Sequence, residues 1–169
     1  MPHELPLVMQ FQSYQLHTQI AFAWNKNMSE TKHTFNVFLC YAHNDREVVH
    51  NLYISMKEDG INAWLDSENL QPGQDWQREI HKAILKSDAI LVCLSQEFNK
   101  QHGFRYEELR VALKKAKSLP NDEIFVIPVR LEKCDMPESL RHLHRVDLFE
   151  AAGYKKLLRT LKRLKDSNQ

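Results

Sequence analysis

The sequence predicts an α/β fold, a flavodoxin-like and doubly wound sheet of five parallel strands. Five strand-length apolar runs alternate with amphipathic helix patterns, and this alternation requires a parallel sheet that is covered on both faces. The run at 89–94 consists of apolar residues alone. The chain has 169 residues, of which 43% are hydrophobic and 27% charged, so it can bury a core as one globular domain.

The strands are expected where β-branched, aromatic and aliphatic residues follow one another without interruption. Polar residues bound each run, and Pro72-Gly73 marks a turn within the polar loop 67–75. The five expected strands are, in chain order, 35–41, 61–65, 89–94, 124–129 and 146–148.

The helices are expected between the strands, where apolar residues recur at helical spacing. The first begins at an N-cap formed by Asn44 or Asp45 and ends at Asp59-Gly60. Trp76 opens the next helical stripe and is expected in the core. The apolar residues that mark the helices are Val48, Val49, Leu52, Tyr53 and Met56; Trp76, Ile80, Ala83 and Ile84; Leu109, Ala112, Leu113 and Ala116; Leu157, Leu158, Leu161 and Leu164.

The domain is expected to span residues 34–165, with a short tail at 166–169. Residues 1–33 are expected to be an N-terminal extension, because a polar stretch at 28–33 comes just ahead of the first strand. Met28 is a candidate original start, which would make 1–27 an addition to the native chain. The alternative, a helix in 1–27 that packs on the domain, stays open.

Charge and cysteine content exclude several classes of protein. Lys plus Arg total 23 and Asp plus Glu 22, so the net charge of +1 offers no electrostatic footprint for nucleic acid or an anionic membrane. No run approaches the ~20 apolar residues of a membrane span, and 1–27 lacks the features of a secretory signal. Two of the three cysteines, Cys40 and Cys93, lie in apolar runs, and Cys134 forms no CxxC motif with them. We therefore expect a cytoplasmic protein with reduced, buried thiols.

The candidate binding residues follow the first three strands. Ligands of open α/β sheets bind outside the carboxyl ends of the strands. Aromatic rings there can stack on a base, and carboxylates can hold ribose hydroxyls, so the composition favours a sugar or nucleotide ligand. The residues are Tyr41, Asp45, Trp64, Asp66 and Ser95.

Several other chemistries have no motif in the chain. GxGxxG, GxxxxGK[ST] and GxSxG motifs are absent, and the acidic residues that a phosphoacceptor domain needs are missing after the first and third strands. The nine histidines are scattered, so no metal site is expected.

Residues 38–47, FLCYAHNDRE, resemble the first conserved box of bacterial Toll/interleukin-1 receptor (TIR) domains. Residues 60–66 and 70–76, GINAWLD and LQPGQDW, resemble the second strand and the BB loop of that family. The resemblance covers about residues 34–164 in order and implies the same fold. It continues through 79–80, 87–95, 108–113, 127–129 and 140–147.

The family contains signalling scaffolds and enzymes that cleave nicotinamide adenine dinucleotide (NAD+). For the enzymes, the resemblance implies a catalytic glutamate early in the helix after the third strand, four residues beyond an aromatic residue. Glu108 fits this spacing from Phe104, although Phe104 stands where the family usually has Trp. The rival, Glu107, lies one residue out of register. The resemblance therefore implies that Glu108 is catalytic and that Phe104 lines the substrate pocket.

The resemblance also implies that activity depends on assembly with other TIR domains or with further copies of this chain. The BB loop of one copy would then help to build the site of the next. The residues to which this role is assigned are Leu70, Pro72, Gly73 and Asp75.

One carboxylate is enough to cleave the bond between nicotinamide and ribose in NAD+. Nicotinamide in NAD+ is already a cationic pyridinium, so it leaves as a neutral molecule, whereas an ordinary glycosidic oxygen needs a general acid. The carboxylate of Glu108 would hold the ribose hydroxyls and stabilise the developing oxocarbenium charge. Attack by water gives ADP-ribose, and attack by adenine gives a cyclic ADP-ribose. The resemblance therefore implies that NAD+ is the substrate, and no cofactor is expected.

Two other functions stay open: a non-catalytic TIR adaptor that acts by self-association, and another nucleoside N-glycosidic enzyme such as a deoxyribosyltransferase. Purely structural roles also stay open for the candidate residues. These are a solvated Glu108 paired with Arg105 or Lys115, core positions for Tyr41 and Trp64, a helix cap at Asp45, a loop cap at Asp66, a turn at Ser95 and a solvated basic face on the last helix.

Overall fold

The computed structural model describes residues 34–100, 104–120 and 123–168, without the side chains of 104–106. The expectations for residues 1–33 concern a segment outside the described residues. Within the described ranges, no helix is both long and apolar enough to cross a membrane.

Five parallel strands form one sheet in the order β2-β1-β3-β4-β5, which confirms the predicted fold class. Every residue of the central strand β3 is buried, as its apolar sequence requires. At the far edge, β5 pairs only with Val129 and Arg130 of β4. The strands are β1 (Asn36–Cys40), β2 (Asn62–Trp64), β3 (Ala89–Leu94), β4 (Val126–Arg130) and β5 (Val146–Asp147).

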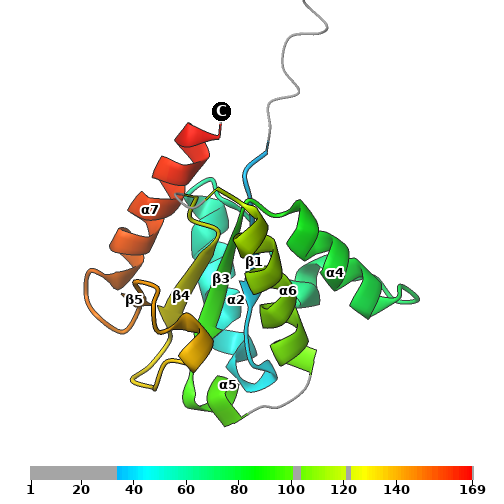
Figure 1. Ribbon diagram of the computed structural model, residues 1–169, viewed down its shortest axis with the longest axis horizontal. Helices are drawn as coiled ribbons and strands as arrows, with labels where there is room; N and C mark the ends of the chain where they lie inside the picture. The colour runs from blue at the N-terminus through cyan, green and yellow to red at the C-terminus, as the bar shows by residue number, and fades with distance from the viewer. Residues whose placement is uncertain (1–33, 101–103, 121–122, 169) are drawn as a thin grey trace, which may run out of the picture. The chain divides into compact units, whose positions relative to one another are not determined.

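Helices cover both faces of the sheet and define two apolar clusters (Figure 1). On one face, α2 (Arg46–Glu58) and α7 (Gly153–Ser167) pack on the side chains of alternate strand residues. On the other, α4 (Trp76–Lys86) and α6 (Phe104–Ser118) do the same. Alternation along a strand sends successive side chains to opposite faces, so each strand contributes to both clusters.

Short helical segments lie in the connections that the sequence patterns left irregular. Ser67–Asp75 was expected to be a loop, but it begins within one helical turn, α3 (Asp66–Asn69). After β3 the chain forms α5 (Gln96–Lys100), which the sequence analysis did not predict. Two 3₁₀ turns, η1 (His43–Asp45) and η2 (Glu138–Leu140), complete the fold. These segments are too short to show a helical repeat in sequence.

The expected core position of Trp76 is wrong, since 48% of this residue is exposed. Ile80 and Ile84, one and two turns further along α4, are buried as expected. Trp76 is the first residue of α4, and the start of this helix projects beyond the sheet (Figure 1). The helical spacing of the apolar residues in α4 is therefore predicted correctly, but the first of them lies beyond the surface on which the helix packs. Cys40 and Cys93 are buried and form no disulfide with each other, and burial raises the pKa of Cys93 to about 12.

Candidate functional site

The candidate site lies where β1 runs between β2 and β3. After β1 the chain continues to β2 on one side of β1, whereas β3 lies on the other side and leads on to β4. The connections that leave the carboxyl ends of β1 and β3 therefore run in opposite directions. In open α/β sheets, ligands bind outside the carboxyl ends of the strands at such a point of divergence. Residues directly after the two strands are therefore the ones to compare with the sequence prediction.

Asp45 and Ser95 meet across this switch point. Ser95 follows β3, is buried, and donates its hydroxyl proton to Oδ2 of Asp45 over 2.5 Å. The same hydroxyl oxygen accepts the backbone N–H of Phe98 at 2.9 Å, so Ser95 also caps α5. Asp45 stands at the N-cap position of α2 but makes no side-chain capping bond there. The interpretation of Asp45 as a simple helix cap is therefore wrong.

The surroundings of Asp45 oppose its ionisation. Partial burial raises the pKa of Asp45 above its usual value, and the negative charges of Glu132 and Glu97 raise it further, against the lowering effect of the Ser95 hydrogen bond. Glu97 accepts a hydrogen bond from Asn44, and Glu132 accepts the N–H of Gln96. This group of carboxylates favours a ligand that carries or develops positive charge.

Tyr41 and Asp66 form a second pair, between the ends of β1 and β2. The Tyr41 hydroxyl donates to Oδ1 of Asp66 over 2.5 Å, and the same oxygen accepts the N–H of Ser67 at 2.8 Å. The ring of Tyr41 is buried in the apolar cluster under α2 and α7. Tyr41 therefore anchors Asp66 and the start of the following loop from within the core, as the core interpretation of Tyr41 anticipated.

Trp64 lies on the opposite face of the sheet from the Tyr41 ring. Its indole stacks on Phe38, with 5.0 Å between ring centroids and 15° between the planes. It is partly buried against the cluster under α4 and α6. Trp64 thus joins the face of the sheet on which α6 packs.

Glu107 and Glu108 are adjacent in sequence but differ completely in environment. The side chain of Glu107 is 53% exposed and pairs with Arg110 at 2.6 Å, one turn along α6. Glu108 is only 2% exposed. Leu109, the next residue, belongs to the apolar cluster that also holds Cys40, Ala42 and Phe98, which flank the switch point. A solvated Glu108 is therefore excluded.

Lys115 is also engaged elsewhere than at Glu108. Its ammonium donates to the carbonyl oxygens of Leu85 at 2.8 Å and Ser87 at 2.5 Å, which closes the C-terminal end of α4. Partial burial lowers the pKa of Lys115. The side chains of Arg105 and Phe104 lie outside the described residues.

The BB loop is held at both ends and exposed in the middle. Leu70 is partly buried against the cluster under α4 and α6, whereas Pro72 and Gly73 are exposed. Gly73 has a φ of +86°, which only glycine adopts without strain. The Asp75 side chain accepts the N–H of Arg78 and so caps α4. Asp75 thus has a structural role in this chain, and the exposed tip is available for contacts.

The structure thus brings the predicted residues together in two hydrogen-bonded pairs, Asp45 with Ser95 and Tyr41 with Asp66. Sequence reasoning missed Asn44, Glu97 and Glu132, which surround Asp45. Glu97, in the first turn of α5 after β3, could have been noticed as a candidate in the sequence. Nothing in the sequence, however, shows that it lies next to the loop after β1. Among the described residues, no group of three His, Cys, Asp or Glu side chains could hold a metal ion.

Comparison with known proteins agrees with this architecture. Over 84 residues, 49% of this chain and 25% of the relative, the sequence is 27% identical to the probable 2′ cyclic ADP-D-ribose synthase TcpO of Methanobrevibacter olleyae. Over 74 residues, 43% of this chain and 22% of the relative, it is 31% identical to the NAD(+) hydrolase TcpA of a Theionarchaea archaeon. The chain thus spans a quarter or less of the length of these curated relatives.

A solved structure gives the same answer for the fold. The TIR domain of the Toll-related receptor TRR-2 from Hydra magnipapillata superposes with a TM-score of 0.64 at 25% identity, over 76% of this chain and 99% of that one. The TIR domain family itself matches residues 37–161, which is most of the chain. This protein therefore belongs to the TIR domain family.

Proposed function

We propose that this chain is a cytoplasmic, NAD+-cleaving TIR domain that acts in bacterial immune or stress signalling, including defence against phage. It breaks the bond between nicotinamide and ribose and releases nicotinamide with ADP-ribose or a cyclic ADP-ribose. The names of the two curated relatives, an NAD(+) hydrolase and a cyclic ADP-ribose synthase, support this substrate. The observation that carries the proposal is the burial of Glu108 beside an exposed Glu107.

In this proposal Glu108 is the catalytic carboxylate. A buried glutamate acts on a developing cation in an environment of lower dielectric constant than water, where its charge has more effect. The bond between ribose C1′ and the pyridinium nitrogen breaks, and its electron pair neutralises the ring. Water then attacks C1′ and loses a proton to solvent, or the adenine ring attacks instead. Glu108 holds the ribose hydroxyls and favours the oxocarbenium ion.

The remaining candidate residues either contact the substrate or position the residues that do. Trp64 and Phe104 line the pocket for the rings, and Asp45 contributes negative potential near the ribose. Tyr41 and Ser95 act through their partners, since their hydroxyls bind Asp66 and Asp45. We therefore assign both hydroxyls to positioning, and the two aspartates to substrate contact.

Assembly completes the site in this proposal. Glu108 is 2% exposed, so a substrate needs the edge to open before it can reach the carboxylate. A neighbouring copy would supply that change through the exposed tip of its BB loop, at Pro72 and Gly73. Assembly-dependent activity should rise more steeply than linearly with protein concentration.

The test is nicotinamide release from NAD+, followed by chromatography across a range of protein concentrations. We expect release that depends on concentration, and a steep loss in Pro72→Ala without loss of folding, because Pro72 is exposed. Normal turnover by a variant that sedimentation shows to be monomeric would overturn the assembly requirement. The co-product identifies the hydrolase or the cyclase reaction.

The residue at position 104 favours a second candidate, a non-catalytic TIR adaptor. Phe104 stands where the family usually has Trp, and this departure fits a domain that only self-associates. Absence of nicotinamide release, even from the assembled protein, would favour the adaptor.

A further inference from the structure

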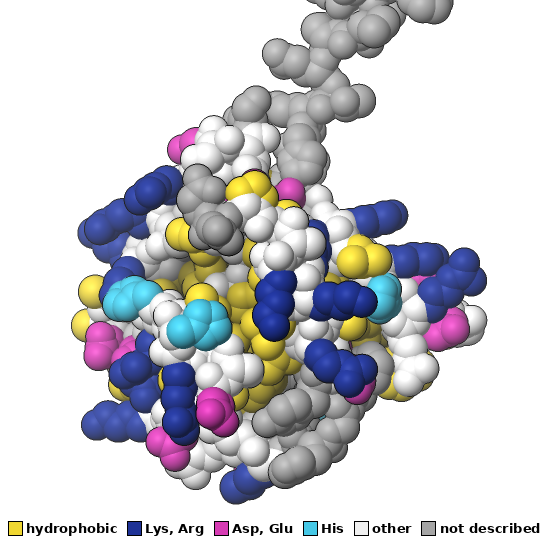
Figure 2. Space-filling model, in the orientation of Figure 1, with side chains coloured by type: hydrophobic (Ala, Val, Ile, Leu, Met, Phe, Trp, Pro, Cys, Tyr) yellow, Lys and Arg dark blue, Asp and Glu magenta, His cyan; other side chains and the backbone are white. Residues whose placement is uncertain are grey.

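A groove of about 910 Å³ lies away from the candidate site, between α6, the start of β4, the 138–146 segment and α7. Its walls and floor are mainly aliphatic and aromatic. Figure 2 shows hydrophobic side chains gathered in a hollow on this face, with Lys, Arg and His side chains around it. The apolar residues of the groove are Leu113, Ala116, Leu119, Ile124, Phe125, Val126, Ile127, Leu143 and Val146.

The groove exists because the far side of the sheet is incompletely covered. β5 has two residues and pairs only with the last two residues of β4. Between β4 and β5 the described chain forms only the three-residue η2, instead of a full crossover helix. Among the described residues, the first half of β4 therefore has no paired strand on its side away from β3.

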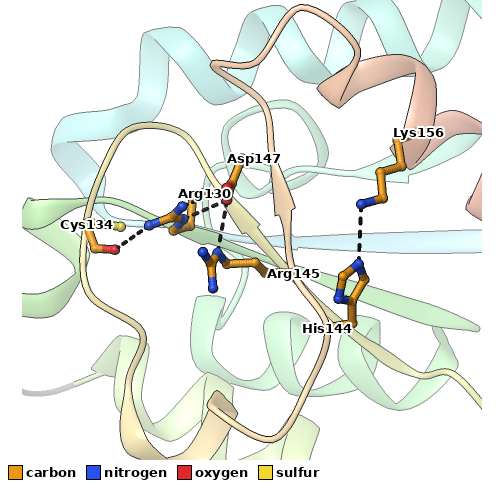
Figure 3. Close-up of polar contacts among 6 residues, drawn as sticks. All are labelled: Arg130, Cys134, His144, Arg145, Asp147 and Lys156. Atoms are coloured by element: carbon orange, nitrogen blue, oxygen red, sulfur yellow. Dashed lines mark hydrogen bonds and ion pairs between the residues drawn. The ribbon is translucent and has the colours of Figure 1, made fainter.

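A cation without a carboxylate partner lies at this groove. Lys156 Nζ lies 3.3 Å from Nε2 of His144, and because an ammonium can only donate, the imidazole nitrogen is the acceptor in this contact (Figure 3). Among the described residues, the polar contact of Lys156 is this imidazole and not an acid. Asp147, the carboxylate at the end of β5, is held by Arg130 and Arg145 instead (Figure 3).

The position of Lys156 in α7 strengthens the local positive potential. The first turn of this 15-residue helix contains Lys155 and Lys156 and no acidic residue, and Ala152 at the N-cap makes no side-chain capping bond. The amino end of a helix is itself positive, so two lysines there are unfavourable unless an anion binds nearby. The acids that line the groove, Glu123 and Glu138, belong to other elements, ahead of β4 and in η2.

The shape of the edge argues against an added peptide strand. The N–H of Leu148 binds the carbonyl of Arg130, whereas the N–H of Leu131 binds Leu94 of β3. Even-numbered residues of β4 therefore direct their backbone groups toward the groove side. Pro128 is one of these and has no N–H, so a strand paired here would lack a donor. An apolar chain with one negative group fits this groove better.

We propose that this groove binds an amphiphilic monoanion, a medium-chain carboxylate, with its alkyl chain on the apolar floor and its carboxylate at Lys156. The volume is within the range of small-molecule sites. The site is separate from the NAD+-cleaving site and goes beyond the proposed function. Its test therefore needs no catalytic activity.

The probe is sodium dodecanoate below its micelle concentration, titrated into the full chain by calorimetry. We expect saturable binding that is weakened about tenfold by Lys156→Gln, as for loss of one charge-assisted hydrogen bond. Lys155→Gln is the matched control and should bind normally, because Lys155 is also exposed but does not line the groove. Ala116→Phe, which fills the floor, should abolish binding while circular dichroism shows an intact fold.

Dodecyltrimethylammonium, with the same chain and the opposite charge, should bind at least tenfold more weakly than dodecanoate. Equal binding of the two probes, or an unchanged affinity in Lys156→Gln, would overturn the proposal, since contact would then be apolar and unspecific. Absence of dodecanoate binding together with altered self-association in the Lys156→Gln and Ala116→Phe variants would assign the groove to a second copy and also overturn it.

Discussion

Two aspartates at the same edge of the sheet have opposite surroundings. Asp147 ends β5 and accepts two hydrogen bonds of 2.6 Å from Arg130 and one of 3.2 Å from Arg145. Asp45 follows β1, accepts from the Ser95 hydroxyl, and is surrounded by further carboxylates. Arg130 holds the pKa of Asp147 below its usual value, whereas burial and like charges raise that of Asp45.

The different surroundings of Asp147 and Asp45 separate a structural region at β5 from a functional region at β1 and β3. A carboxylate fixed by arginines ties β4 to β5 and stabilises the fold. A carboxylate kept among like charges costs stability, and such groups concentrate at sites that bind or react. The β5 side is therefore expected to respond to mutation through folding, and the β1–β3 side through activity. The following predictions test this division, beginning with the largest expected effect on stability.

The largest effect is expected for Gly153→Ala, on the structural side. A Cβ at this position would lie 2.1 Å from the carbonyl oxygen of Asp147, so α7 must move away from β5. Overpacking against backbone costs about 2–3 kcal/mol, although glycine to alanine inside a helix normally stabilises. Urea denaturation measures the loss, with Ala151→Ser at an exposed position as the control. An unchanged midpoint would contradict close packing of α7 on β5.

Asp147→Asn should lower the free energy of unfolding at pH 7 by about 2 kcal/mol, because it leaves Arg130 partly buried without its counter-charge. The lowered pKa of Asp147 means that its contribution is complete above the unfolded value of about 3.9 and disappears as the pH falls through the folded value. Parent and variant should therefore converge in acid. A difference that stays constant down to the lowest pH would contradict the ion-pair explanation.

Asp45→Asn should have a small effect of opposite sign, a gain of about a few tenths of a kcal/mol at pH 7, since the site is partly exposed. Asparagine keeps an acceptor for Ser95 and removes the charge that faces Glu97 and Glu132. Because the folded pKa is raised, the parent loses stability as the pH rises through it, so the advantage of the variant should grow from pH 3 to pH 7. Nicotinamide release should fall in the same variant.

Loss of stability in Asp45→Asn at neutral pH, with unchanged activity, would place Asp45 on the structural side. Ser95→Ala separates the two contributions further. It removes the hydroxyl that binds Asp45 and also uncaps α5, so it should destabilise the fold by about 1 kcal/mol.

The sequence patterns predicted the sheet and the longer helices because a buried strand or a helix face repeats over many residues. They located Asp45 and Ser95 at one edge, but their hydrogen bond joins residues 50 apart, and nothing local encodes it. The error at Trp76 has the same origin, since period alone does not say where the surface under a helix ends. α5 depends on a capping hydroxyl that also binds Asp45, so its start is fixed by a tertiary contact.

The contact between Arg130 and Asp147 carried a weak signal in the sequence. Opposite charges at the ends of two successive parallel strands are a pattern that could be recognised once β4 and β5 are known to pair. The burial of Glu108 also carried a weak signal, because Glu108 lies four residues before Ala112 of the apolar stripe and Glu107 does not. The register of α6 on the sheet distinguishes them.

The central claim is that Glu108, and not Glu107, acts on NAD+. The direct measurement compares nicotinamide release by the assembled parent, Glu108→Gln and Glu107→Gln, with the fold and the assembly state checked for each. The account predicts release by the parent and by Glu107→Gln at similar rates, and a loss of at least about 100-fold in Glu108→Gln, the scale of losing one preorganised electrostatic group. Full activity in a folded, assembled Glu108→Gln protein would contradict it.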